Sequence, residues 1–151
     1  MAQQEPQNFS NHTRTIPLYH YVAMPLLALN LLWTGYQLFN RLLEESGRRN
    51  AAAQFVVAGV LLILVFYARI MALTVQDRVI RLEETLRMQR LLPENLRSRI
   101  GEFSVAQMVA LRFASDAELP ELAAKVLSDK IAERKAIKLM IKNWRADYQR
   151  A

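Results

Sequence analysis

The stretch that decides the fold is residues 50–68, NAAAQFVVAGVLLILVFYA, which contains no Asp, Glu, Lys or Arg. A helix needs about 20 residues to cross the hydrocarbon core of a bilayer, and this stretch has about that length. Its apolar residues do not alternate with polar ones, which excludes a strand of an outer-membrane barrel. We therefore predict a transmembrane helix over residues 51–69.

A second uncharged stretch lies before it, at residues 15–40, TIPLYHYVAMPLLALNLLWTGYQLFN. It predicts another transmembrane helix over residues 16–40. The stretch is too long and begins too late for a cleaved signal peptide, and it contains Pro25, so we expect an uncleaved anchor. The alternative is a pair of core helices in a water-soluble protein, which two adjacent stretches of this length in so short a chain disfavour.

The connection between the two stretches, RLLEESGRRN at residues 41–50, is short enough to force an antiparallel hairpin with both chain termini on one side. Arginines near the membrane ends outnumber those of the loop, namely Arg14, Arg69, Arg78, Arg81 and Arg87 against Arg41, Arg48 and Arg49. By the positive-inside rule, both termini are expected in the cytoplasm and the loop in the periplasm.

Polar residues inside the first span lie on one helix face, since Asn30, Thr34 and Gln37 are spaced by four and three. An antiparallel hairpin brings Gln37 level with Gln54, so we predict an amide hydrogen bond between them, and it brings Asn30 near Gly59, where the backbones can approach closely. A bond from Asn30 to its copy in a neighbouring protomer is the alternative. We expect His20, at the span boundary, to be structural, and haem or chlorophyll ligation is the other reading.

The second helix is predicted to continue past the membrane to Pro93, the first helix breaker after it. Its extension carries an apolar seam with heptad-like spacing, formed by Ala72, Val75, Val79, Leu82 and Leu86. The seam lasts about two heptads, so we expect it to be a docking face for the chain's own later helices rather than a free coiled coil. The predicted order is an N-terminal cytoplasmic segment 1–15, span 16–40, loop 41–50, span 51–69, helical extension 70–92 and helical tail 93–151.

Within the tail, Ser104–Gln107 and Ser115–Glu118 have the pattern of capping boxes that start helices. The second start is expected to lead into one long helix, from about Glu118 to Arg145 or beyond. Its basic edge is Lys130, Arg134, Lys138, Lys142 and Arg145, and its apolar edge is Ile137, Met140, Ile141, Trp144 and Tyr148. Two interpretations stay open, a helix lying on anionic lipid and a helix docked on the seam.

Several function classes are disfavoured by composition. The chain has 151 residues, a formal net charge of +6 and no cysteine, so it has neither disulfides nor a thiolate metal site. The acidic pairs Glu44–Glu45 and Glu83–Glu84 are adjacent in sequence and read as solvated faces, so we predict no enzyme, no catalytic residue and no cofactor or metal site. No nucleic-acid-binding motif is present.

Four blocks of sequence, residues 8–26, 75–87, 110–127 and 137–150, resemble the recurring blocks of an uncharacterised family of small two-span bacterial inner-membrane proteins. The resemblance implies an inner-membrane protein with a cytoplasmic helical tail and implies no activity.

The sequence as a whole thus predicts an all-α integral membrane hairpin with a long continuous second helix and a cytoplasmic helical domain. Two functions are compatible with it. The first is a membrane-anchored helical adaptor or accessory subunit of a membrane complex. The second is a membrane-active oligomerising protein, holin-like or lipid-organising, with a basic amphipathic tail. The expected partners are the lipid bilayer and either another protein or a second copy bound through the tail.

Overall fold

A computed structural model describes residues 6–12, 15–42 and 46–147, and in these residues every regular element is a helix. The all-α prediction is therefore confirmed. The chain divides into two compact units, one of residues 14–72 and one that combines residues 1–13 with residues 73–151. Residues 1–13, which precede the first predicted span, are grouped in one unit with the tail.

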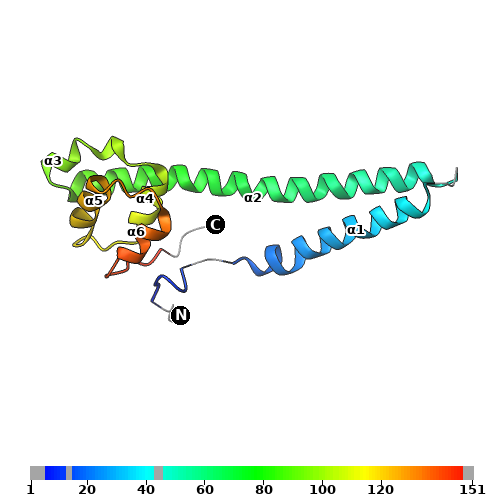
Figure 1. The fold of residues 1–151 in the computed structure, drawn as a ribbon, viewed down its shortest axis with the longest axis horizontal. Helices are drawn as coiled ribbons and strands as arrows, with labels where there is room; N and C mark the ends of the chain where they lie inside the picture. The colour runs from blue at the N-terminus through cyan, green and yellow to red at the C-terminus, as the bar shows by residue number, and fades with distance from the viewer. Residues whose placement is uncertain (1–5, 13–14, 43–45, 148–151) are drawn as a thin grey trace. The chain divides into compact units, whose positions relative to one another are not determined.

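The unit of residues 14–72 is a helical hairpin. A π-helical stretch, Leu18–Ala23, leads directly into α1 (Met24–Asn40), which lies beside the first part of α2 (Arg48–Leu91) (Figure 1). The helical run Leu18–Asn40 has 23 residues and α2 has 44, and only 6% of the most apolar window of each is buried. Both helices are long and apolar enough to cross a membrane.

The register of the hairpin agrees with the sequence prediction to within one residue. A Cβ placed on Gly59 would lie 3.9 Å from Cδ1 of Leu31, and one placed on Gly35 would lie 3.2 Å from Cε2 of Phe55. The close approach of the helices is therefore at Gly35, where a side chain would press on the Phe55 ring, rather than beside Asn30.

The polar positions of the hairpin behave differently from the prediction. Thr34 is buried, and its hydroxyl donates to the carbonyl oxygens of Asn30 (2.8 Å) and Leu31 (3.1 Å) of its own helix. The side chains of Asn30 and Gln54 are exposed, and no hydrogen bond joins Gln37 to Gln54 in the described part of the chain. The amide pair is thus not formed, and the buried polar residue of the hairpin is Thr34, whose hydroxyl is satisfied within its own helix.

His20 has a structural contact at the start of the hairpin. Its Nδ1 lies 3.0 Å from the backbone nitrogen of Ile16, which donates to it, and its ring is 5.0 Å from that of Tyr19. The Tyr19 hydroxyl in turn donates to the carbonyl oxygen of Val65 on α2, at 3.3 Å. These contacts hold His20 and Tyr19 at the start of the hairpin.

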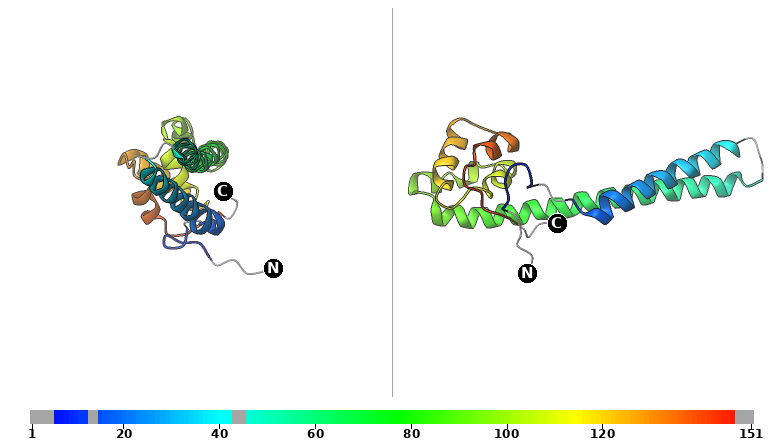
Figure 2. Two further views of the ribbon diagram at one scale, coloured as in Figure 1. Left: turned by 90° about the vertical axis from the view of Figure 1, so that its right-hand side faces the viewer. Right: turned by 90° about the horizontal axis from the view of Figure 1, so that it is seen from below.

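The second unit is a small helical domain built on the C-terminal part of α2. Short helices gather there: α3 (Glu94–Arg97), the 3₁₀ turn Ile100–Glu102, α4 (Val105–Leu111), α5 (Leu119–Ser128) and α6 (Arg134–Met140) (Figures 1 and 2). The largest fully buried side chains are Phe113, Met88, Leu92, Met108, Leu111, Leu119, Ile137 and Val126. Two of them, Met88 and Leu92, belong to α2 or directly follow it, so this helix supplies one wall of the core.

Two sequence signals set helix ends as predicted. The last residue of α2 is Leu91, two positions before Pro93. At the start of α4, the Ser104 hydroxyl accepts from the backbone N–H of Gln107 (3.2 Å), whose side chain accepts from the backbone N–H of Ser104 (2.8 Å). This is a complete capping box. The Ser115 hydroxyl also accepts from the backbone N–H of Glu118, at 3.3 Å. This bond closes a turn before α5, which begins at Leu119, and does not cap the helix itself.

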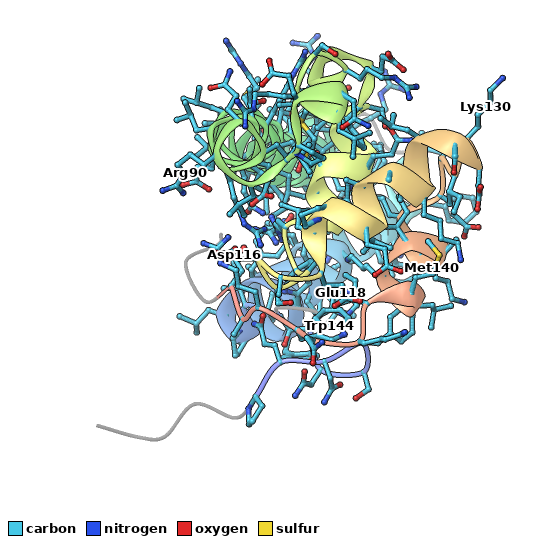
Figure 3. The ribbon with its side chains drawn as sticks, turned by 90° about the vertical axis from the view of Figure 1, so that its left-hand side faces the viewer. Arg90, Asp116, Glu118, Lys130, Met140 and Trp144 are labelled. Carbon is cyan, nitrogen blue, oxygen red and sulfur yellow. The ribbon has the colours of Figure 1, made fainter. Side chains whose placement is uncertain are left out.

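The prediction of one long tail helix from Glu118 to Arg145 is wrong, since the helix ends after α5 and a separate helix, α6, follows. Lys130 has φ +51°, the left-handed conformation, and the N–H of Ile131 donates to the carbonyl oxygen of Val126 at 3.0 Å. The N–H of Lys130 reaches the carbonyl oxygen of Leu127 at 3.4 Å, which completes a Schellman ending. Lys130 projects from the end of α5 (Figure 3), and the predicted basic edge is divided between separate elements. Tyr148 lies outside the described residues.

After α6 the chain is extended and returns along the loop that follows α4. The N–H of Ser115 donates to the carbonyl oxygen of Asn143 (2.9 Å), and the N–H of Arg145 donates to that of Phe113 (2.7 Å). These bonds make one isolated antiparallel bridge, between Ala114 and Trp144.

The N-terminal segment packs against this extended chain, a contact that the sequence did not predict. The side-chain amide of Gln7 donates to the carbonyl oxygen of Asp147 (3.1 Å) and accepts from its N–H (2.9 Å). The His12 ring lies 5.7 Å from that of Trp144 and 5.8 Å from that of Phe113. The two ends of the described chain therefore belong to one packed structure.

Candidate functional site: a buried arginine network and an exposed apolar seam

The centre of the helical domain is a buried guanidinium, that of Arg87 on α2, whose residue is 4% exposed. Its Nε donates to Oδ1 of Asp116 (2.8 Å), its Nη1 to Oε2 of Glu84 (3.1 Å) and its Nη2 to the carbonyl oxygen of Ala114 (2.6 Å). Nη1 also lies 3.4 Å from the carbonyl oxygen of Arg112. Only arginine presents so many N–H groups in a fixed plane, which explains the residue type at this position.

These contacts place a positive charge at the C-terminal end of α4. The helix ends at Leu111, and the carbonyl groups after it have no partner within the helix. Arg87 supplies hydrogen bonds to two of them, at Arg112 and Ala114, and its charge is favourable beside the negative end of the helix dipole. Arg87 therefore ties α2 to the end of α4.

Glu84 lies one turn before Arg87 and is equally buried, at 4% exposure. Its Oε1 is 3.8 Å from Nη1 of Arg145, which approaches from the extended C-terminal segment. Burial raises the pKa of Glu84 above its ordinary value, and this effect outweighs the opposite influences of Arg87, Arg145 and Arg112. The free energy lost by removing the ionised carboxylate from water exceeds the free energy gained from the surrounding arginines.

Arg112 extends the network towards both ends of the chain. Its residue is buried, its Nε lies 3.4 Å from Oδ2 of Asp147, and its guanidinium carbon is 4.6 Å from the centroid of the Phe113 ring. The backbone of Asp147 is the group that Gln7 holds. The arginine network thus connects α2, the loop after α4, the C-terminal segment and the N-terminal segment.

The network forms the floor of an open groove of about 1240 Å³. One wall comes from α2, with Glu83, Leu86 and Arg90, and the other from the C-terminal segment, with Arg145 and Asp147. Among the described residues, no group of three or more His, Asp or Glu side chains gathers as a metal site. The charged side chains of this network pair with one another, through Arg87 with Glu84, Arg145 with Glu84 and Arg112 with Asp147.

The predicted seam lies on the part of α2 that the domain leaves uncovered. Val75, Val79, Leu82 and Leu86 are 59%, 49%, 62% and 53% exposed. The buried side chains of this stretch are Ile80, Glu84, Arg87 and Met88, and they lie on the other side of the helix. The prediction that the tail docks on the seam is therefore wrong, because the domain docks on the opposite face of α2, through the buried Glu84 and Arg87 and the apolar Ile80 and Met88.

Two of the predicted basic residues make ion pairs with α2. Nη2 of Arg134, at the start of α6, lies 3.2 Å from Oδ2 of Asp77. Arg145 reaches Glu84, as described above. Both side chains therefore contribute to docking of the tail, although not onto the seam.

Three further predicted tail residues, Lys138, Lys142 and Trp144, contact Phe113 or Glu118. Nζ of Lys138 lies 5.0 Å from the centroid of the Phe113 ring, and the Trp144 ring is 5.1 Å from it. Lys142 contributes its backbone, whose N–H donates to the Glu118 carboxylate at 2.9 Å. These residues do not form a single basic face.

Sequence reasoning missed Glu84, Arg87 and the Glu118 carboxylate as structural groups. The adjacency of Glu83 and Glu84 predicts a solvated face, and the position of Arg87 places it among the arginines near the membrane ends. One signal was visible. Ile80 and Met88, two large apolar residues spaced by eight, lie on the same face as Glu84 and mark that face as buried.

Comparison with known proteins adds a family and no activity. The chain matches, over residues 1–151, the sequence profile of a family described as "Family of unknown function (DUF6526)". No curated protein matches the chain. No solved structure matches it either.

We expect Arg87→Met to destabilise the domain by about 3–5 kcal/mol, because it leaves Glu84 and the carbonyl groups after α4 buried without their partner. The matched control is Arg90→Met, one turn further along α2, where the side chain projects outward (Figure 3) and the loss should be within about 0.5 kcal/mol. The measurement is chemical unfolding of the full chain in detergent, followed by fluorescence of Trp144 in a Trp33→Phe background. Equal losses for the two variants would contradict the structural part given to Arg87.

A pH dependence follows from the raised pKa of Glu84. A carboxyl with a raised folded-state pKa weakens the fold where it is ionised, and this penalty disappears as the pH falls through the folded-state pKa towards the unfolded value of about 4.3. The difference in free energy of unfolding between Glu84→Gln and the parent chain should therefore be most favourable to glutamine at neutral pH and should shrink on acidification. A difference that grows on acidification would refute the assignment.

Proposed function

The chain belongs to this family of unknown function, and from that premise we propose that it is a membrane-anchored helical adaptor or accessory subunit of a membrane complex. The proposed location is the bacterial inner membrane, with two spans and both termini in the cytoplasm. The observation that carries the proposal is the continuity of α2, one 44-residue helix that contains an apolar stretch long enough to span and also supplies the docking helix of the folded domain.

Membrane insertion is supported by the surface of the hairpin unit. Many of its large apolar side chains are more than half exposed, including Leu26, Leu29, Leu32, Trp33, Val56, Ile63, Leu64 and Phe66. A soluble monomer rarely exposes an apolar surface of this extent, because apolar area in contact with water is unfavourable. Lipid is the environment that such a surface fits.

Two crossings of the membrane are supported by the packing of both chain ends in the other unit. Residues 6–12 pack on the C-terminal segment through Gln7 and His12, so both ends belong on one side of any membrane. An even number of crossings follows, which agrees with two spans.

The orientation of the hairpin rests on the positive-inside rule. Arg87 is left out of the count of arginines on the terminal side, because it is buried and paired within the domain. The balance then becomes four arginines (Arg14, Arg69, Arg78 and Arg81) against three in the loop (Arg41, Arg48 and Arg49). The sign of the difference still favours cytoplasmic termini.

The adaptor is favoured over the membrane-active alternative by the form of the tail. A lipid-organising tail was proposed on the strength of one continuous basic amphipathic helix, and the left-handed Lys130 divides that stretch. The domain instead has its own core and presents an uncovered apolar seam. The alternative remains a prediction with less support than the adaptor, and we propose lipid and protein as the partners, without a cofactor or nucleic acid.

Single cysteines test the topology directly, since the chain has none of its own. In intact spheroplasts, an impermeant thiol reagent should label Ser46→Cys in the loop and should label Ser128→Cys only after permeabilisation. The two serines are both exposed, so accessibility within the protein is matched. Labelling of Ser128→Cys alone would reverse the orientation, and labelling of both in intact spheroplasts would remove the two-span topology.

Purification from native membranes in mild detergent tests the adaptor itself. We expect the full chain to leave the membrane in a complex of fixed stoichiometry, and the complex should survive a rise in salt that removes adventitious bound protein. Leakage of the host membrane on expression, with no complex at any salt concentration, would instead establish the membrane-active alternative.

A further inference from the structure

We propose that the seam of Val75, Val79, Leu82 and Leu86 pairs with the same seam of a second copy of this chain, as a short parallel coiled coil. This inference rests on the proposed function, since it identifies a protein partner of the anchored domain as another copy.

The first support is that the chain itself leaves the seam uncovered. All four side chains are about half exposed or more, whereas Ile80, Glu84 and Arg87 on the other side of the helix are buried in the domain. Four large aliphatic groups in one row are costly in water and gain when another apolar surface covers them.

The second support is the spacing of the seam. Its residues follow steps of four, three and four, which places Val79 and Leu86 at the a positions and Val75 and Leu82 at the d positions of a heptad. The a and d positions each hold one valine and one leucine, so both are filled by aliphatic side chains suited to a coiled-coil core. The buried residues Ile80 and Glu84 then fall at b and f, the outer positions of a coiled coil, whereas Val79 and Leu86 also line the groove beside the C-terminal segment.

The third support is the direction of α2. Copies inserted in one membrane with the same topology have their α2 helices pointing the same way, so pairing must be parallel. Confinement to a membrane also raises the effective concentration of one seam for another. A seam of two heptads, too short to pair strongly in solution, suffices under that condition.

The fourth support is the charge of the flanking residues. In this register Arg78 occupies a g position and Glu83 the e position five residues later, and both side chains are exposed. A parallel pair brings g of one helix beside that e of the other, so Arg78 of one copy meets Glu83 of the second copy, and two-fold symmetry repeats the contact. The next such pair, Thr85 and Arg90, is not repulsive. An antiparallel pair would match g with g and e with e, which does not bring Arg78 to Glu83.

Disulfide cross-linking of the full chain in native membranes tests the pairing. Leu82→Cys places a thiol at a d position, where the two copies face each other at a distance suited to a disulfide. Arg81→Cys is the matched control, because it is the neighbouring exposed position and points away from the seam. Mild oxidation should give several-fold more covalent dimer from Leu82→Cys than from Arg81→Cys.

Charge reversal tests the register. In the Leu82→Cys background, Arg78→Glu or Glu83→Arg alone converts two attractions into two repulsions and should lower the dimer yield several-fold. The two changes together should restore it, and Arg81→Glu, with the same change of charge off the seam, should leave it unchanged. Failure of the double variant to recover would overturn the parallel register.

Other outcomes overturn the second copy as the partner. A cross-linked product containing a different protein would do so, as would equal dimer yields from positions 82 and 81. Extraction of the same membranes with alkaline carbonate separates this failure from that of the proposed function. Chain retained in the membrane without a Leu82→Cys dimer overturns the pairing alone, and chain released into the supernatant overturns the membrane anchor.

Discussion

The helical domain depends on the buried guanidinium of Arg87. Its helices after α2 have only 4, 7, 10 and 7 residues, lengths at which an isolated helix is unstable in water. They persist because they dock on α2, and Arg87 is where α2 meets the end of α4, the Asp116 carboxylate and the loop carbonyl groups at once. A buried ion network adds little net stability, but losing one member leaves the others uncompensated, which makes the arrangement specific.

This interaction gives α2 two different faces. The chain's own tail buries the face with Glu84 and Arg87, whereas the seam with Val79 and Leu82 stays exposed. The same helix also contains an apolar stretch long enough to span a bilayer. The domain thus covers one face of α2 and leaves an apolar face uncovered, and this uncovered face is the basis of the proposed adaptor.

Features set by local chemistry could be predicted from the sequence. The continuous α2 and its end before Pro93 follow from helix propensity and a breaker, and the start of α4 follows from the Ser104 capping box. The register of the hairpin follows from the shortness of its loop, and the contacts of Gly35 and Gly59 agree with it.

Features set by tertiary contact could not be predicted in this way. The break after α5 has lysine, not glycine, in the left-handed position, so the usual stop signal is missing at Lys130. Glu84 and Arg87 have the composition of a solvated face, and Arg87 is buried because Asp116 and the carbonyl groups after α4, far away in sequence, accept its hydrogen bonds. The apolar spacing of Val79 and Leu82 predicts a docking face more strongly than that of Ile80 and Met88, although the latter pair is the one that the tail buries.

Hydrogen–deuterium exchange of the full chain in lipid nanodiscs tests most directly the central claim, that α2 and the tail form one cooperative domain. The account predicts that amides of residues 84–91 in α2 and of α4 exchange through a common opening, with the same free energy and the same response to denaturant. Exchange of the α4 amides at a much lower free energy, with those of α2 still protected, would contradict it, because the tail would then open without releasing the helix to which Arg87 ties it.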